Sequence, residues 1–150
     1  MKISLDELLP YVLTQLSHYE REKFRASLRV HLAILCEPYL QWILQGKKTI
    51  ESRFSVRQGL PYRRVSIGDI LLLKRTSGPV VAYCSVEAVI YATRKPEDLY
   101  WQLHQFSKDT KYATLMRVHQ VQHLDPIEVG RARGDRRPWI ILRDSSERTR

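Results

Sequence analysis

The sequence predicts an α+β fold, namely a small mixed β-barrel with short flanking helices and a helical extension at its N-terminus. Three observations predict it. Short β-like segments follow one another from residue 29 onward, with only two helical segments between them. An amphipathic helical pattern precedes them. The chain has 150 residues, 43% of them hydrophobic, which suits one domain with a real core. We therefore expect a helical extension over 1–28, the barrel domain over 29–142 and a polar tail over 143–150.

Residues 4–28 have the pattern of helices. Ser4 and Glu7 have the spacing of a capping box, in which each side chain bonds the other residue's backbone. Residues 18–27 are polar and indicate a second, more exposed helix or an extension of the first. We favour packing of the apolar stripe of the first helix against the chain's own barrel; the alternative is that residues 5–16 bind a protein partner or a second copy of the chain. The stripe consists of Leu5, Leu8, Leu9, Val12, Leu13 and Leu16.

The rest of the chain shows β-like segments with helical patterns between them. A short helix begins at Glu37-Pro38, because proline is favoured at the first helical position, and it ends at Gly46. A second helix is expected over 96–106, where acidic residues follow a proline. Two loops rich in arginine are expected over 55–68 and 130–138. The expected strands are 29–36, 49–54, 69–76, 80–91, 112–124 and 139–142.

The charge balance indicates a polyanionic partner. Lys and Arg number 25 against 16 Asp and Glu, so the net charge is +9 and the pI is about 9.8. Nucleic acid is the commonest partner of a protein with such an excess of positive charge, and an anionic membrane is the other candidate. No apolar run approaches the ~20 residues that span a bilayer, and Asp6 and Glu7 interrupt the first one. Cys36 and Cys84 lie in apolar runs, so we expect buried, reduced thiols and a cytoplasmic location.

One segment carries a family resemblance. Gly46, Lys48, Glu51 and Arg53 form a Gly-x-Lys-x-x-Glu-x-Arg pattern after a proline-led helix, and Gly68-Asp69 precedes the next strand. This arrangement resembles the ASCH family, a branch of the PUA-like barrel folds, over about residues 29–142. The resemblance implies a PUA-like barrel that binds RNA through a cleft beside the motif.

The resemblance also implies an enzymatic alternative. Some small members of the family resemble amidohydrolases that act on acylated cytidine, and others resemble ribonucleases. The amidohydrolase type has a lysine that matches Lys48, but it has a threonine where this chain has Glu51. A carboxylate does not replace a hydroxyl nucleophile without a change of chemistry. We therefore favour a binding module over a catalyst, with Lys48 and Glu51 as the candidate acid–base pair if there is catalysis.

The motif residues combine two cations with one carboxylate. On a strand Glu51 and Arg53 share a face, whereas Lys48 reaches the same site only if the chain turns between Gly46 and Lys48. In the functional interpretation, Glu51 accepts hydrogen bonds from a base edge or holds Arg53. Lys48 and Arg53 then bind a phosphate or a carbonyl group. The alternative is an internal Glu–Arg pair that closes the barrel.

Further cations and aromatic residues surround the motif. From residue 46 to 75 the balance is 8 − 2 = +6, and residues 131–150 add 7 − 3 = +4. These residues form either a phosphate track or solvated basic loops. Tyr62 is our candidate for stacking on a base, whereas Trp42 and Trp139 are expected in the core. The expected nucleic-acid-binding residues are Lys47, Lys48, Glu51, Arg53, Arg57, Tyr62, Arg63, Arg64 and Arg75, with Lys74 beside them.

No metal or cofactor is expected. His119 and His123 are four residues apart, but no carboxylate or thiol cluster accompanies them. The sequence also has no glycine-rich phosphate loop and no Ser-His-Asp signature. The prediction is therefore a protein that binds single-stranded RNA or a nucleotide in a basic cleft, with no membrane partner. The alternative is a hydrolase acting on RNA or modified nucleosides.

Overall fold

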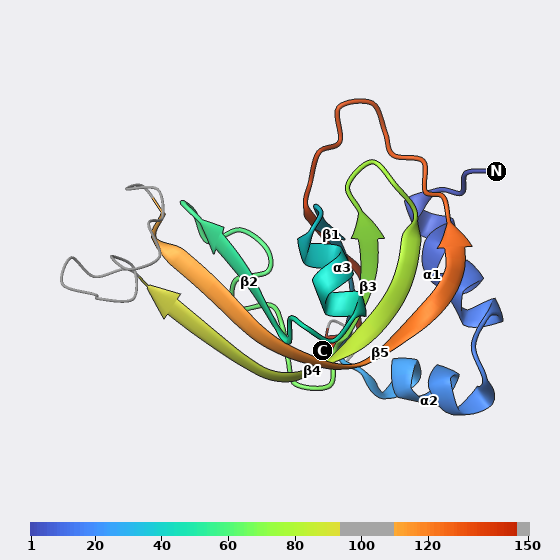
Figure 1. Ribbon diagram of the computed structural model, residues 1–150, viewed down its shortest axis with the longest axis horizontal. Helices are drawn as coiled ribbons and strands as arrows, with labels where there is room; N and C mark the ends of the chain where they lie inside the picture. Colours follow the sequence, from blue (N-terminus) through green and yellow to red (C-terminus); the bar gives the residue numbers. More distant parts are fainter. Residues whose placement is uncertain (94–109, 147–150) are drawn as a thin grey trace.

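The computed structural model describes residues 1–93 and 110–146. The helix expected over 96–106 lies outside these residues. Within them the chain forms three helices and six strands, and each expected strand is present with shifts of a few residues at its ends (Figure 1). The elements are α1 (Leu5–Thr14), α2 (His18–Ala26), β1 (Arg29–Leu35), α3 (Tyr39–Leu44), β2 (Ile50–Ser55), β3 (Ile70–Arg75), β4 (Val80–Thr93), β5 (Tyr112–Ile127) and β6 (Trp139–Asp144).

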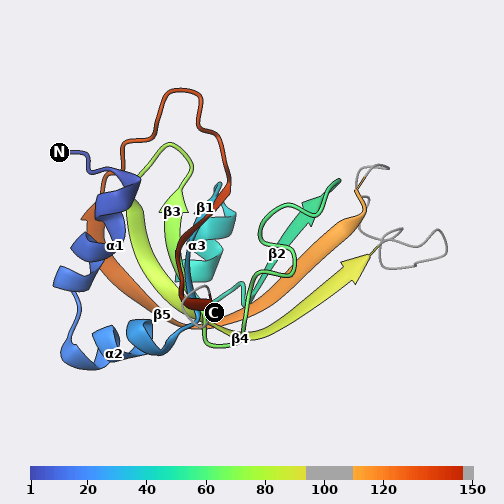
Figure 2. The same cartoon turned by 180° about the vertical axis from the view of Figure 1, so that it is seen from behind.

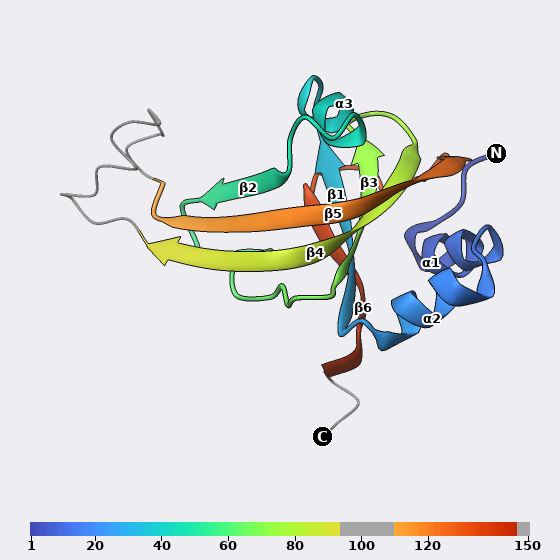
Figure 3. The same cartoon turned by 60° about the horizontal axis from the view of Figure 1, so that its bottom comes forward.

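All six strands form one sheet in the order β2-β5-β4-β3-β1-β6. The β1–β3 pair is parallel and the other pairs are antiparallel. The long strands β4 and β5 span the molecule, so that β5 pairs with β2 at one end and β4 pairs with β3 at the other (Figure 3). Three register shifts within the β4–β5 pair accompany its bend, because bulges kink and twist a strand.

The sheet is not closed. Within the described residues, the edge strands β2 and β6 have no backbone pairing with each other. The predicted mixed α+β fold is therefore confirmed, but the backbone does not form a closed barrel. The order of strands along the sequence cannot reveal closure, because closure depends on the tilt and stagger of the strands.

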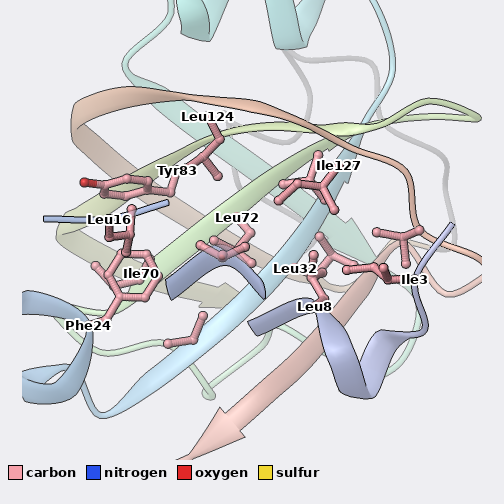
Figure 4. Close-up of a cluster of buried hydrophobic side chains, with 14 of the residues drawn as sticks. Ile3, Leu8, Leu16, Phe24, Leu32, Ile70, Leu72, Tyr83, Leu124 and Ile127 are labelled. Atoms are coloured by element: carbon pink, nitrogen blue, oxygen red, sulfur yellow. The ribbon is translucent and has the colours of Figure 1, made fainter. Parts of the chain in front are cut away.

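The N-terminal helices pack on one face of the sheet, at the end away from β2 (Figure 2). Both begin with a capping box, on Ser4 with Glu7 and on Ser17 with Glu20. The apolar stripe of α1 faces the sheet, since Leu8 and Val12 are fully buried. Figure 4 shows this core between the helices and the strands. The stripe thus packs against the chain's own sheet, which is the arrangement that we favoured. Its neighbours in this core include Phe24, Leu32, Ile70, Leu72, Tyr83 and Ile127.

A second apolar cluster lies under α3. Leu40 and Ile43 of this helix pack on residues of β1, β3, β4 and β5. The backbone of Gly46 has a φ of +74°, and its N–H bonds the carbonyl of Ile43. A left-handed residue just after a helix favours glycine, so Gly46 ends α3 as the sequence indicated.

The C-terminal strand continues further than expected. β6 runs to Asp144, whereas the polar tail was expected to start at residue 143. The guanidinium of Arg143 donates to the carbonyls of Phe24 and Ser27, and it thereby joins β6 to the end of α2. A polar side chain gives no sign of such a contact in the sequence. In the part of the chain that is described, no helix has the length and apolar character needed to cross a membrane.

Candidate functional site

A hollow of about 380 Å³ lies between the end of β1, α3 and β2. Its size is within the range of pockets that hold small ligands. Three of the four motif residues line it, together with one exposed cysteine and one exposed aromatic ring. The lining residues are Ile34, Leu35, Cys36, Tyr39, Lys48, Glu51, Ser52, Arg53 and Phe54.

The fourth motif residue, Gly46, brings Lys48 to the hollow. After the left-handed turn at Gly46, the N–H groups of Lys47 and Lys48 both bond the carbonyl of Trp42. The chain therefore turns where we expected, and Lys48 faces the same site as Glu51 despite its opposite parity. The ammonium of Lys48 donates to the carbonyl of Ile50 and lies 4.0 Å from Oε2 of Glu51.

Glu51 forms the floor of the hollow. Its side chain is 8% exposed, and Oε1 accepts a hydrogen bond from Nε of Arg53 over 3.2 Å. Among the described residues, Oε2 has no hydrogen-bond partner. A buried polar atom usually has one, because leaving it unpaired costs about 1–3 kcal/mol. This oxygen is thus a buried acceptor with unused hydrogen-bonding capacity, in a residue that lines the hollow.

Arg53 connects the two sides of the open sheet. Its Nη2 donates to the carbonyl of Ile34 in β1 over 2.8 Å, and its Nη1 donates to the carbonyl of Pro138 over 3.3 Å. The guanidinium also lies over the ring of Trp139, 5.1 Å from its centroid. With Glu51, these contacts engage all three guanidinium nitrogens. Arg53 therefore forms the internal Glu–Arg pair that we considered as an alternative. Its side chain connects β2 with β1 and with the residue before β6, across the gap in the sheet that the backbone leaves open.

The comparisons with known proteins identify the family and agree with the fold. The model of the ASCH domain family matches residues 34–128, well over half of the chain. This chain belongs to the ASCH domain family. The crystal structure of ASCH from Zymomonas mobilis is similar to it with a TM-score of 0.55 and 19% identity, over 81% of this chain and 93% of that chain.

Two variants of the Zymomonas mobilis protein give the same result. One is 19% identical with a TM-score of 0.55, over 82% of this chain and 94% of that chain. The other is 20% identical with a TM-score of 0.54, over 81% of this chain and 95% of that chain. At this identity the likeness establishes the fold alone. No protein with a curated description matched the sequence.

Several predicted residues of this ASCH domain lie away from the hollow. Tyr62 is only 5% exposed and packs against the rings of Tyr91 and Tyr112, with centroids 5.5 and 5.0 Å away. Little of this ring is open to a base in this arrangement, so the structure gives no support to the stacking role expected of Tyr62. Its position between a proline and two arginines suggested a solvent-exposed loop, but the loop folds back onto the β4–β5 hairpin. The other predicted residues that do not line the hollow are Lys47, Arg57, Arg63, Arg64 and Arg75.

Two of these arginines already have carboxylate partners. Arg64 donates to Asp144 over 2.9 Å, and Arg75 donates to Glu37 over 3.2 Å. Lys47, Arg57 and Arg63 are exposed. The cations of the +6 segment therefore do not all line the hollow.

The aromatic residues of α3 also differ from expectation. Trp139 is buried as predicted, but Trp42 is 42% exposed and Tyr39 is 47% exposed. Their rings meet edge to face with centroids 5.6 Å apart. Cys36, expected to be buried, is exposed beside them, whereas Cys84 is buried. A helix of six residues presents few positions to the core, and Leu40 and Ile43 occupy them.

A buried polar chain behind the hollow was not foreseen. Asp69 accepts hydrogen bonds from Nε2 of His31 and from the backbone N–H groups of Arg29 and Ser66. Gly68, directly before Asp69, adopts a φ of +90° that favours glycine and turns the chain into this position. The sequence signal that could have indicated this buried chain is His31, a histidine among the apolar residues of β1.

Metal ligation has no basis within residues 1–93 and 110–146. No group of three or more His, Cys, Asp or Glu side chains is arranged there to hold a metal ion. The imidazole of His119 instead lies 4.0 Å from the carboxylate of Glu87, and both side chains are well exposed.

Proposed function

We propose that this ASCH domain binds single-stranded RNA by holding one base in the hollow between β1, α3 and β2. The observation that carries the proposal is Oε2 of Glu51, a buried acceptor in a residue that lines the hollow, with no hydrogen-bond partner among the described residues. A ligand that supplies an N–H donor would satisfy it.

The charges of the hollow indicate what such a ligand presents. A carboxylate accepts well from the exocyclic amino group of cytosine, and a lysine donates to carbonyl or phosphate oxygens. Glu51 and Lys48 place these two functions 4.0 Å apart. Arg53 acts as a positioning residue, because it holds Oε1 of Glu51 and leaves Oε2 without a hydrogen bond of its own among the described residues.

The exposed rings of Tyr39 and Trp42 supply the apolar part of the proposed interface. Unpaired bases stack on aromatic side chains, at about 1–3 kcal/mol per base. Tyr39 lines the hollow and Trp42 is its neighbour on α3. These residues take the role that the sequence suggested for Tyr62.

The test is binding of a labelled ten-nucleotide oligocytidine RNA, followed by fluorescence anisotropy at low salt. Glu51→Gln keeps the size of the side chain but presents an amide in place of a carboxylate. We expect it and Tyr39→Ala each to weaken binding by about tenfold. Tyr19→Ala is the matched control, because Tyr19 is 72% exposed on α2 and outside the hollow. Absence of binding by the unaltered protein would refute the proposal.

The second candidate function is hydrolysis of RNA or of an acylated nucleoside. The proximity of Lys48 to Glu51 favours it, since a lysine and a carboxylate in one hollow can act as acid and base. Incubation with RNA and with acylated cytidine, beside a Lys48→Ala variant, distinguishes the two functions. Turnover by the unaltered protein that Lys48→Ala abolishes would favour the enzyme, and unchanged substrates would exclude it.

A further inference from the structure

A second hollow, of about 660 Å³, adjoins the first at the end of β1. Ile34 and Cys36 line both hollows, so the two are neighbours. The second hollow is bounded by the β3–β4 turn, the end of β5 and the loop that precedes β6. Its charged lining residues are Lys2, Lys74, Glu128, Arg131, Asp135, Arg136 and Arg137.

Lys74 is the buried cation of this hollow. Its residue is only 5% exposed, and its ammonium makes one hydrogen bond, to the carbonyl of Arg75 over 3.1 Å. No carboxylate of the described residues lies within ion-pair distance of it. Burial of an ammonium group is costly unless a counter-charge and further acceptors compensate. Two of its three N–H donors thus lack an acceptor within residues 1–93 and 110–146.

Arg131 adds a second under-used donor. Its side chain is 16% exposed, and Nη2 bonds Asp135 over 2.7 Å and the carbonyl of Arg137 over 2.8 Å. Its Nε is buried and has no partner among the described residues. Asp135 is in turn held by Arg137 over 2.9 Å, so this carboxylate is already engaged. With Glu128 as the other anion, the charges of the lining sum to 5 − 2 = +3.

We propose that this second hollow binds a phosphate group of the same RNA strand whose base occupies the first hollow, an inference that rests on the proposed RNA-binding function. Ammonium and guanidinium groups are donors only, and a phosphate offers several acceptor oxygens with the negative charge that the site lacks. Burial lowers the pKa of Lys74, the charges of Arg131 and Lys2 lower it further, and Glu128 opposes them. A bound phosphate, like Glu128, would act against this lowering of the pKa of Lys74.

The experiment measures the affinity for the oligocytidine RNA as a function of salt, in Arg136→Gln and Lys74→Met variants. Arg136 is exposed and lines the hollow, and its replacement leaves every buried contact of the loop in place. Lys74→Met keeps the apolar stem of the side chain. Arg133→Gln is the matched control, since Arg133 belongs to the same loop but does not line the hollow.

We expect about tenfold weaker binding for Lys74→Met, and a smaller loss for Arg136→Gln. Each should reduce the slope of log affinity against log salt by about 0.7, the value for one phosphate on a single strand. An unchanged affinity and slope in Arg136→Gln and in a folded Lys74→Met protein would overturn the inference. An unaltered slope in Arg136→Gln together with an unfolded Lys74→Met protein would overturn it as well.

A second measurement separates this inference from the proposed function. Inorganic phosphate is titrated against the unaltered protein, and the amide NMR signals of both hollows are followed. Shifts confined to the second hollow, with no RNA binding, would refute the proposed function and leave a phosphate site. RNA binding that Glu51→Gln weakens and that neither basic variant affects would refute only the inference on phosphate.

Discussion

The indole N–H of Trp139 donates a hydrogen bond to Nδ1 of His31 over 3.0 Å, and this bond fixes the tautomer of a buried imidazole. An indole nitrogen is a donor only, so Nδ1 must accept and the ring hydrogen must reside on Nε2. Nε2 then donates to Asp69 over 2.8 Å. The face of Trp139 also lies beneath Arg53. The buried chain of bonds therefore supports the residue that positions Glu51.

Trp139→Phe tests this support. Phenylalanine keeps an aromatic ring but leaves Nδ1 of His31 without a donor and some buried volume unfilled, and the cost of the unpaired acceptor alone is about 1–3 kcal/mol. We expect the free energy of unfolding, measured by urea denaturation, to fall by about this amount. Trp42→Phe, in which the ring is partly exposed, should change it by less than about 0.5 kcal/mol. Equal losses in the two variants would contradict the role given to the indole N–H.

Arg53→Met tests the side-chain bridge between the two sides of the sheet. The substitution leaves the buried carboxylate of Glu51 without its hydrogen-bonded cation, and breaking a buried pair in this way costs roughly 3–5 kcal/mol. The double variant Glu51→Gln with Arg53→Met removes the uncompensated charge and should recover part of the loss in a double-mutant cycle. Arg57→Met is the exposed control. If the double variant is no more stable than Arg53→Met alone, the buried charge is not the source of the loss.

The sequence predicted the described strands and helices because each leaves a local signature. The capping box at Ser4, the glycine that ends α3 and the alternation of apolar residues all act within a few residues. Closure of the sheet is not local. It depends on how the β4–β5 hairpin bends, and the gap is closed by contacts of Arg53 with Ile34 and with Pro138, 85 residues away. No short-range pattern predicts such a contact.

The site was predicted in part for the same reason. Lys48, Glu51 and Arg53 meet at one hollow because a helix stop and a strand separated by a short turn determine their positions. The flanking arginines and Tyr62 were assigned from their distance along the chain, and this distance does not determine which face of the molecule a loop occupies. Lys74 was grouped with the cations that flank the motif, but its place in a central strand buries it. A charge pattern in the sequence indicates that the protein attracts anions, but it does not show which surface of the folded molecule the charges occupy.

Acid stability should depend on Asp144. Burial alone would raise the pKa of this carboxyl, but hydrogen bonds from Ser146, Arg29 and Arg64 outweigh burial and hold the pKa well below its usual range. A carboxyl with a depressed folded-state pKa stabilises the fold above its unfolded pKa near 4, and this contribution is lost as the pH falls further. We expect Asp144→Asn to be less stable than the unaltered protein at pH 7 and closer to it at pH 2.5, by urea denaturation.

The control for this pH dependence is Asp125→Asn, at an exposed residue whose side chain has no ion pair within the described part of the chain. It should leave the difference in stability between pH 7 and pH 2.5 nearly unchanged. A pH profile of Asp144→Asn that runs parallel to that of the unaltered protein would show that the carboxyl has no coupling to folding.

The two cysteines should differ in reactivity, and the difference reports on the hollow itself. Burial raises the pKa of the Cys84 thiol to about 12, and the nearby carboxylate of Glu51 adds to the rise. At pH 8 only about 1 in 10,000 such thiols is ionised, and Cys84 is also shielded from reagent. Cys36 is exposed and lines both hollows. A disulfide reagent should therefore modify one thiol rapidly in the folded protein and the second only after denaturation.

Cys36→Ser is the control that assigns the rapid reaction, because it should abolish the fast phase and keep the slow one. Oligocytidine RNA should slow the modification of Cys36 in proportion to its occupancy if the RNA lies across the two hollows. Inorganic phosphate should slow it only to the extent that the second hollow fills. A fast phase that saturating RNA leaves unchanged would mean that the RNA binds elsewhere, because an exposed thiol at the junction of both hollows cannot keep its reactivity under a bound strand.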